Sequence, residues 1–372
     1  MSPDAIVIGA GAIGTSVAYN LAKSGARVMI FDRGQAGAES TGASAGMIIA
    51  HHDRSTPPPF KALSAESARL FPALAEELKD RTGIDIGLRR TGVLQVALDD
   101  GRARELRHER AWQVDQGMVV PWLDARAALD VEPALNPAIH AAIFYSEDQQ
   151  LLPLALARAL AQAAADLGAV LREGATIDRL LIESDRVVGV GLGEEAIRTA
   201  EVVIANGSWA SAWSSALRVP IPVRPVRGQM VALRTPVTAL RNVISGEQGY
   251  VLTKPDGSTY VGTTVEEAGF DARPTVAGIG RLLQLAPRLV PRLAEATFAR
   301  AWAGLRPATP DGLPLLGRIP GWQGVSLAAG HFRNGILLAP ITGELIADLL
   351  ARRRPRLALD AFDPGRFLVR AA

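Results

Sequence analysis

The sequence predicts an α/β protein in which a mainly parallel sheet and an antiparallel sheet are built from alternating stretches of one chain. Three observations lead to this prediction: a glycine-rich turn between a strand and a helix near the N-terminus, a β-hairpin pattern in the middle, and a second glycine-rich strand-to-helix junction near the C-terminus. The chain has 372 residues, 48% of them hydrophobic, which suits two closely packed domains.

The N-terminal turn has the features of a dinucleotide-binding unit. An apolar strand at 5–8 leads into the pattern G-x-G-x-x-G, which lays a pyrophosphate on a helix N-terminus. A helical pattern follows over 15–24, and the next strand, 27–31, ends on Asp32, where an acid binds ribose hydroxyls. Together these features predict a Rossmann-like domain, and they fit FAD and NAD equally well. The residues of the turn are Gly9, Ala10, Gly11, Ala12, Ile13 and Gly14.

The segment after Asp32 is built almost entirely of small residues. Residues 34–46 are Gly, Ala, Ser and Thr except for a glutamine and a glutamate, so the backbone can approach a ligand closely. We expect this segment to wrap a pyrophosphate and a ribityl chain, with a surface loop as the alternative. Residues 42–46 also match G-x-S-x-G, but the serine turn of hydrolases follows an apolar strand, and 38–41 is not apolar. We therefore reject a serine nucleophile.

The middle of the chain alternates helical and strand patterns. Strands at 250–253 and 260–263 flank Pro255-Asp256-Gly257-Ser258, which is a clear hairpin signal. Arginines and glutamates are interleaved over 104–110, as on a solvated helix face. The further elements predicted are helices at 60–79, 153–167 and 276–289 and strands at 89–98 and 202–205.

The order of these elements predicts two interleaved domains. One is Rossmann-like and comes in three pieces, and the other is built around an antiparallel sheet in two pieces. The first domain is expected to contain residues 1–83, 146–219 and 302–372, and the second residues 84–145 and 220–301.

Composition excludes several classes of function. The formal net charge is +2 and the sequence pI is about 9.1, with few lysines, so we expect no nucleic-acid partner. The absence of cysteine excludes disulfides, thiolate metal sites and a cysteinyl cofactor link. Five histidines without paired spacing predict no metal site. Because the first strand begins at Ala5, we expect no signal peptide, no membrane partner and a cytoplasmic protein.

The C-terminal junction indicates FAD rather than NAD. The chain reads W-A-G-L-R-P-A-T-P-D-G from Trp302 and A-G-H-F-R-N-G-I-L-L-A-P from Ala329. A nicotinamide dehydrogenase needs only the first junction. A flavoprotein needs both when its chain returns to the first sheet and covers the flavin ring. A helix is expected from Ile336 to Leu350, with Pro340 in its first turn and its dipole directed at the flavin.

On these motifs the chain resembles the glycine oxidases of the D-amino acid oxidase superfamily over nearly its whole length. The residues from His331 to Pro340 are close to the sequence motif of that family. The resemblance implies a D-amino acid oxidase-like fold, a Rossmann-like FAD-binding domain interleaved with an antiparallel-sheet substrate-binding domain. It also implies non-covalent FAD and hydride transfer from glycine, sarcosine or small D-amino acids, giving an imine or 2-oxo acid, ammonia and, with oxygen, hydrogen peroxide. The imine could feed thiazole synthesis for thiamine.

The resemblance also assigns residues to the site. It places the substrate carboxylate on Arg306, whose planar guanidinium can donate two parallel bonds, with Tyr250 and Arg333 as further substrate residues. No residue is assigned as an acid or base, because hydride can leave a neutral amine without one, and His331 is expected to be a packing residue. The residues expected against FAD are Gly9, Gly11, Ala12, Ile13, Gly14, Asp32, Arg33, Ser40, Thr41, Ala45, Gly46, Met47, Thr176, Gly330, His331, Phe332, Arg333, Asn334, Gly335, Ile336 and Leu337.

Some features leave alternatives open. Ile49, His52 and Gln248 differ from the residues expected in a glycine pocket, so the side-chain preference and chirality stay open. Two other functions remain: an FAD-dependent D-amino acid dehydrogenase with an acceptor other than oxygen, and a non-catalytic flavin-binding regulator. Self-association into a homo-oligomer is compatible with the sequence but not indicated by it.

Overall fold

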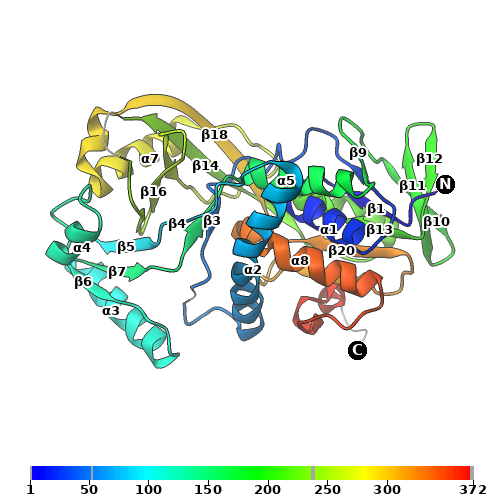
Figure 1. Cartoon of the computed structure of the whole chain (residues 1–372), viewed down its shortest axis with the longest axis horizontal. Coiled ribbons are helices and arrows are strands. Elements are labelled where there is room, and N and C mark those ends of the chain that lie inside the picture. The colour runs from blue at the N-terminus through cyan, green and yellow to red at the C-terminus, as the bar shows by residue number, and fades with distance from the viewer. Residues whose placement is uncertain (1, 52, 236–238, 369–372) are drawn as a thin grey trace.

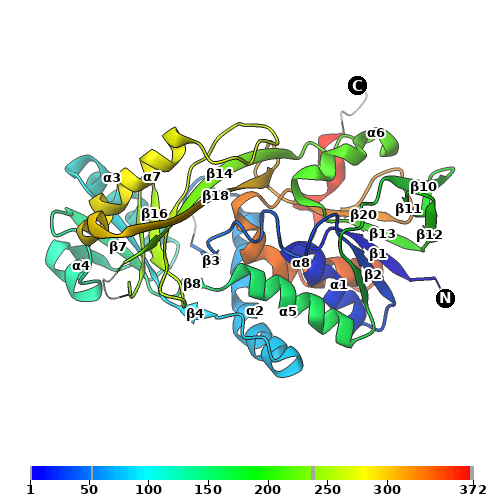
Figure 2. The same cartoon turned by 90° about the horizontal axis from the view of Figure 1, so that it is seen from above.

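The computed structural model describes residues 2–51, 53–235 and 239–368. The molecule is elongated, and its two large sheets lie toward opposite ends (Figures 1 and 2). Both termini lie on the same side as the six-stranded sheet, whereas the eight-stranded sheet is formed entirely from the middle of the chain and a late return strand (Figure 1). The predicted α/β fold is confirmed.

The six-stranded sheet is parallel except for one edge strand. Its order is β19-β20-β13-β1-β2-β9, and only the β19–β20 pair is antiparallel. The apolar, largely β-branched residues of the central strands are buried because helices and a small sheet cover the two faces. The strands are β1 Ala5–Ile8, β2 Val28–Phe31, β9 Val170–Arg172, β13 Glu201–Ile204, β19 Leu315–Arg318 and β20 Val325–Ala329.

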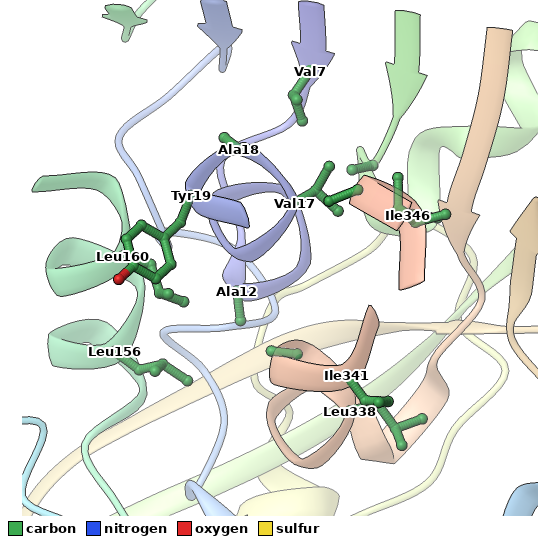
Figure 3. Packing of buried hydrophobic residues seen from close by; sticks show 14 of the residues in the cluster. Val7, Ala12, Val17, Ala18, Tyr19, Leu156, Leu160, Leu338, Ile341 and Ile346 are labelled. Carbon is green, nitrogen blue, oxygen red and sulfur yellow. The ribbon is translucent and has the colours of Figure 1, made fainter. Parts of the chain in front are cut away.

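Helix α1 lies at the centre of the layer that covers one face of this sheet. Figure 3 shows Tyr19 beside Leu160 of α5 and Val17 directed toward Ile346 of α8. A Cβ at Gly343 would overlap Ser16, so this glycine lets α8 cross α1 closely. The helices of this layer are α1 Ala12–Lys23, α2 Pro58–Thr82, α5 Pro153–Asp166 and α8 Gly335–Leu350.

The opposite face is covered by a small antiparallel sheet and a short helical segment. Val187 and Val190 of the small sheet and Ala210 and Trp213 of the helical segment pack on the strands. These elements are β10 Arg179–Glu183, β11 Arg186–Leu192, β12 Glu195–Arg198, η1 Gly207–Trp213 and α6 Ser214–Leu217.

The eight-stranded sheet is antiparallel except where β15 pairs with β5. Its order is β18-β14-β17-β16-β15-β5-β7-β6, with α4 and α7 packed on one face and α3 on the other. The strands are β5 Val93–Ala97, β6 Trp122–Asp124, β7 Ala141–Tyr145, β14 Arg224–Arg234, β15 Val243–Gly246, β16 Gly249–Thr253, β17 Thr259–Gly262 and β18 Thr297–Ala308. The helices are α3 Asp100–Asp115, α4 Ala125–Val131, α7 Val276–Leu289 and η2 Pro291–Glu295.

Three two-residue strands lie between the large sheets (Figure 1). Strand β8 pairs with both of the others, and β4 and β8 belong to segments that pass from one sheet region to the other. They are β3 Met47–Ile48, β4 Arg89–Arg90 and β8 Gln149–Gln150, and the remaining short elements of the chain are η3 Phe332–Asn334, η4 Asp360–Phe362 and η5 Pro364–Phe367.

Most element predictions are confirmed, and one detail is wrong. The helices expected at 60–79, 153–167 and 276–289 are α2, α5 and α7, and the predicted hairpin is β16–β17. Pro340, however, is the sixth residue of α8 and not part of its first turn, because the helix already begins at Gly335. The helix therefore lacks the bond that the N–H of residue 340 would donate to the carbonyl of Ile336.

The domain division stays a proposal, with one shift. The boundary expected at residue 302 falls inside β18, which stays paired with β14 as far as Ala308. We therefore propose that the chain returns to the Rossmann-like domain after Ala308.

Candidate functional site

A cavity of about 470 Å³ is lined by residues from both large sheets. The Rossmann-like side contributes the β1–α1 turn, the small-residue segment and the start of α8. The eight-stranded sheet contributes Gly228, Met230, Tyr250 and Arg306. A ligand that fills this cavity therefore touches both domains. We call the turn at residues 9–14 the dinucleotide turn, and the group Arg306, Tyr250, Thr263 and Arg333 the arginine end.

The dinucleotide turn is formed by backbone geometry. Gly9 has φ +106°, and a Cβ there would lie 2.6 Å from the carbonyl oxygen of Ala205. Asp32 accepts hydrogen bonds from the amides of Ala10 (2.7 Å) and Gly34 (2.8 Å), so it ties the turn to β2 while lining the cavity. Gly11 provides no side-chain cap for α1, and the amide of Ala12 donates to Thr41, so the later amides of the first turn remain for an anionic ligand.

The small-residue segment forms a second wall. The Thr41 hydroxyl accepts from the amide of Ala12 (3.0 Å), and the Trp302 indole donates to the carbonyl of Ala43 (3.1 Å). Ser40 donates to the carbonyl of Leu305, also on β18. The segment thus lies against a strand of the other sheet. It contains turns but no strand before Ser44, so the strand that a hydrolase serine turn requires does not precede this serine.

Arg306 is a half-buried cation without an acid beside it. Its two terminal nitrogens donate to the Thr263 hydroxyl (2.7 Å) and to the Thr264 carbonyl (3.2 Å), and in the described ranges it forms no ion pair. The pKa of Arg306 is lowered, mainly by burial. The positive charge of Arg333 adds to this shift, and the nearby Tyr250 opposes it. Gly228 makes room for this guanidinium, since a Cβ there would overlap it.

Tyr250 is the neutral neighbour of Arg306. Burial raises the pKa of its phenol to about 12, although the two arginines of the arginine end oppose the shift, so the hydroxyl stays protonated at neutral pH. The hydroxyl lies 3.5 Å from the sulfur of Met230. It is therefore available as a donor to an anionic group held by Arg306.

The start of α8 supplies the last wall. Arg333 is exposed and lines the cavity. His331 is 2% exposed, burial lowers its pKa to about 3, and its Nε2 lies 3.1 Å from the Thr342 hydroxyl. The ring is therefore neutral, which supports the expectation of a packing residue. Gly335 and Ile336, at the uncapped N-terminus of the helix, also line the cavity.

The cavity brings together most of the residues expected to contact FAD. All line it except Gly14, Gly330, Asn334 and Leu337. Gly14 packs against Gly9, where a Cβ would overlap, and Leu337 lies in the core. Asn334 is the residue before α8, and a Cβ at Gly330, which has φ +79°, would lie 2.5 Å from Thr309 Cγ2.

Of the three departures from the expected pocket, neither Ile49 nor Gln248 lines the cavity. Ile49 packs against the core beneath the eight-stranded sheet, and Gln248 is exposed. His52 lies outside the described residues.

Sequence reasoning missed several lining residues. Trp209 follows β13, and the Arg33 guanidinium stacks 3.8 Å from the centre of its ring. Met230 lies on β14 of the other sheet, and Thr263 directly follows β17. The strand followed by Asn206, Gly207 and Ser208 was the signal that could have found Trp209, because it repeats the strand-then-glycine pattern of the dinucleotide turn.

The residues present fit FAD. The uncapped helix N-terminus suits a pyrophosphate, and in the described chain Asn206 has a buried Oδ1 that lacks a partner and belongs to a residue lining the cavity. No group of acidic or histidine ligands suited to a metal occurs among the described residues. In the same ranges no helix has the length and apolarity needed to cross a membrane.

Comparison with known proteins agrees with this geometry. Residues 4–349 match the family model described as FAD dependent oxidoreductase. The glycine oxidase of Geobacillus kaustophilus (strain HTA426) is 39% identical over 368 residues, 98% of this chain and 97% of that protein. A crystal structure of glycine oxidase from Geobacillus kaustophilus superposes with a TM-score of 0.93 at 37% identity, covering 99% of both chains. The bifunctional protein ThiO/ThiG of Trichormus variabilis (strain ATCC 29413 / PCC 7937) is 35% identical over all of this chain but only 56% of its own length.

Two glycine-rich junctions, one cavity shared by two sheets and these matches lead to one conclusion: the chain belongs to the family of FAD-dependent oxidoreductases and uses FAD as its cofactor.

Proposed function

We propose that this protein oxidises glycine and other small amine acids, such as sarcosine and small D-amino acids, with oxygen as the second substrate. Glycine, water and oxygen would give glyoxylate, ammonia and hydrogen peroxide, through an imine that water hydrolyses. The observation that carries this proposal is the half-buried Arg306, which lines the cavity and forms no ion pair within the described chain.

Arg306 suits a carboxylate because its present partners are neutral. The Thr263 hydroxyl and the Thr264 carbonyl orient the guanidinium without cancelling its charge. A carboxylate that replaced water here would gain charge-assisted hydrogen bonds of about 1.5–3 kcal/mol each. The acids that line the cavity, Asp32, Glu39 and Asp178, all come from the Rossmann-like side. The arginine end is therefore the electropositive part of the cavity.

The other residues of the arginine end orient the same substrate. The protonated phenol of Tyr250 can donate to one carboxylate oxygen, and Arg333 adds a second positive charge from the start of α8. When bound, FAD supplies the acceptor for the hydride that leaves the α-carbon. The substrate ammonium first loses a proton to solvent, because hydride leaves the α-carbon from the neutral amine, and no residue of the chain is assigned to take that proton.

The relatives support the substrate class. Proteins named glycine oxidase match nearly their whole length, and part of a ThiO/ThiG protein matches this entire chain. We therefore also propose that the imine product can feed thiazole formation for thiamine. FAD is proposed to be non-covalent, since the chain has no cysteine, and acid precipitation should release all yellow colour into the supernatant.

Oxygen consumption by the purified yellow protein tests the function. With glycine, sarcosine or D-alanine we expect oxygen uptake and an equal amount of peroxide, and D-phenylalanine should be poorer by at least about tenfold. Turnover only with an artificial dye would instead make the protein a dehydrogenase. Failure of every amine acid to reduce the bound flavin without oxygen would refute an enzyme of this class.

Three predictions about the protein as a whole also remain proposals: a cytoplasmic location, self-association and the lack of a nucleic-acid partner. Cell fractionation tests the first and light scattering of the purified protein the second. Gel-shift assays with duplex and single-stranded DNA test the third.

A further inference from the structure

Lys254 is a buried cation that the proposed reaction does not use. It follows β16 at the turn of the hairpin and is 4% exposed. Its ammonium donates to the carbonyls of Ala45 and Leu151 (the latter at 3.0 Å) and to the side-chain oxygen of Gln150 (3.3 Å). An ammonium has three N–H donors, so these oxygens satisfy all of them.

The charge of Lys254 is not balanced by an acid. All of its hydrogen-bond partners are neutral, and in the described parts of the chain it belongs to no ion pair. Burial, together with the positive charge of Arg89, lowers the pKa of Lys254 to about 7 against the opposing effect of Asp256, so the side chain is a cation below about pH 7. Burying a lysine in this way costs free energy, and an apolar side chain of similar length would avoid that cost. If Lys254 only held these backbone segments together, it would not need a positive charge.

The partners of Lys254 belong to the wall of the cavity. Ala45, Gly46 and Met47 all line it, and the carbonyl of Ala45 is the one that Lys254 holds. Gly46 has φ +76° and its carbonyl accepts from the amide of Leu151 (2.8 Å), which is itself held by Lys254 through its own carbonyl. The lysine thus reaches from the eight-stranded sheet to the backbone behind this wall.

We propose that Lys254 positions the wall formed by Ala45, Gly46 and Met47 and holds a positive charge behind it that raises the reduction potential of the bound FAD. The proposal rests on the proposed placement of the flavin in this cavity. Two-electron reduction adds negative charge to the ring system, and in a protein interior a unit charge is felt over several ångströms. Removing the cation should therefore make the oxidised flavin harder to reduce.

The test compares Lys254→Met with Lys254→Arg. Both keep a long side chain, but only arginine keeps the charge. The midpoint potential of each holoprotein is measured about one pH unit below the pKa of Lys254, where the ammonium is the main form. The measurement is made without oxygen against a reference dye, in the absence of any amine substrate. We expect the two-electron reduction equilibrium of Lys254→Met to fall at least tenfold, equal to about 30 mV. Lys254→Arg should stay within about threefold of the parent. Lys79→Met, which removes an exposed lysine on α2 paired with Asp85, is the matched control and should change nothing.

The dissociation constant of FAD gives the second readout. Loss of the anchor at Ala45 should weaken FAD binding in Lys254→Met and less so in Lys254→Arg. If Lys254→Met fails to retain FAD, Lys254→Gln replaces it, since the amide keeps two N–H donors without charge. An unchanged potential in the uncharged variant that retains FAD overturns the proposal. Because no amine substrate is present, an altered potential together with a failure to oxidise glycine would refute only the proposed function.

Discussion

The two ends of the cavity are built by different means. At the dinucleotide turn the ligand meets backbone, and the turn itself is a run of consecutive residues, tied by Ala10 to Asp32 at the end of the next strand. At the arginine end the ligand meets side chains, and Arg306 is oriented by Thr263, which follows a different strand. A glycine pattern is visible in a linear sequence, whereas a pair of side chains brought together by a sheet is not. The comparison therefore explains which half of the site can be recognised without a structure.

Replacing Arg306 should give the largest effect on the arginine end. Arg306→Ala removes the carboxylate partner, and we expect a loss of about 2–4 kcal/mol of transition-state stabilisation with FAD retained. This corresponds to a decrease of roughly 30- to 1000-fold in kcat/KM. Arg306→Lys should recover only part of it, because an ammonium cannot form the two-pronged contact. Arg300→Ala, on the same strand outside the cavity, is the control. An unchanged kcat/KM for Arg306→Ala with glycine would remove this residue from the substrate site.

A substitution at the dinucleotide turn should weaken FAD binding without changing substrate binding at the arginine end. Gly9→Ala places a Cβ 2.6 Å from a carbonyl oxygen at a positive φ, so we expect strain of about 1–3 kcal/mol and weaker FAD binding. The KM for glycine of the fraction that still holds FAD should stay near the parent value. Gly25→Ala is matched, because its φ is +88° but no atom lies within 4 Å of the added Cβ. Equal FAD affinities in the two variants would show that the close approach at Gly9 is not needed.

A pH series tests the environment of His331. The folded protein holds this ring neutral with its pKa lowered to about 3, whereas the unfolded chain takes up a proton below about 6.5. Unfolding therefore becomes easier as the pH falls from about 6.5 toward 3, by up to about 1.4 kcal/mol per pH unit from this group. Denaturant unfolding of His331→Gln should show a flatter pH dependence than the parent. A slope equal to the parent's in His331→Gln would contradict the assigned environment.

The smallest effect is expected at Thr263. Thr263→Val removes a neutral acceptor 2.7 Å from Arg306, so the guanidinium is less well oriented, at a cost of about 1 kcal/mol. The KM for glycine should rise about fivefold, with a smaller change in kcat. Thr263→Ser keeps the hydroxyl and should restore most of the affinity. If Ser and Val behave alike, the hydroxyl does not position Arg306.

The same contrast, between local sequence patterns and contacts made only by the fold, explains how much could be predicted from the sequence. The strand, turn and helix patterns identified the Rossmann-like unit and the hairpin because each depends on neighbouring residues. The role proposed for Arg306 came from a resemblance rather than from spacing. Lys254 escaped notice because its partner Ala45 is 209 positions away. Pro340 was misplaced because even a helix that began at Ile336 would count proline as its fifth residue, and the helix begins at Gly335, which makes it the sixth.

The central claim is that Arg306 recognises the carboxylate of a small amine acid, and one comparison tests it most directly. Glycine and glycinamide are mixed in turn with the holoprotein in the absence of oxygen, and bleaching of the flavin is followed in the parent and in Arg306→Ala. The account predicts that the parent is reduced much faster by glycine than by glycinamide, by roughly 30-fold or more, and that the variant loses most of this preference. A preference for glycine that is equally large in both proteins would contradict it.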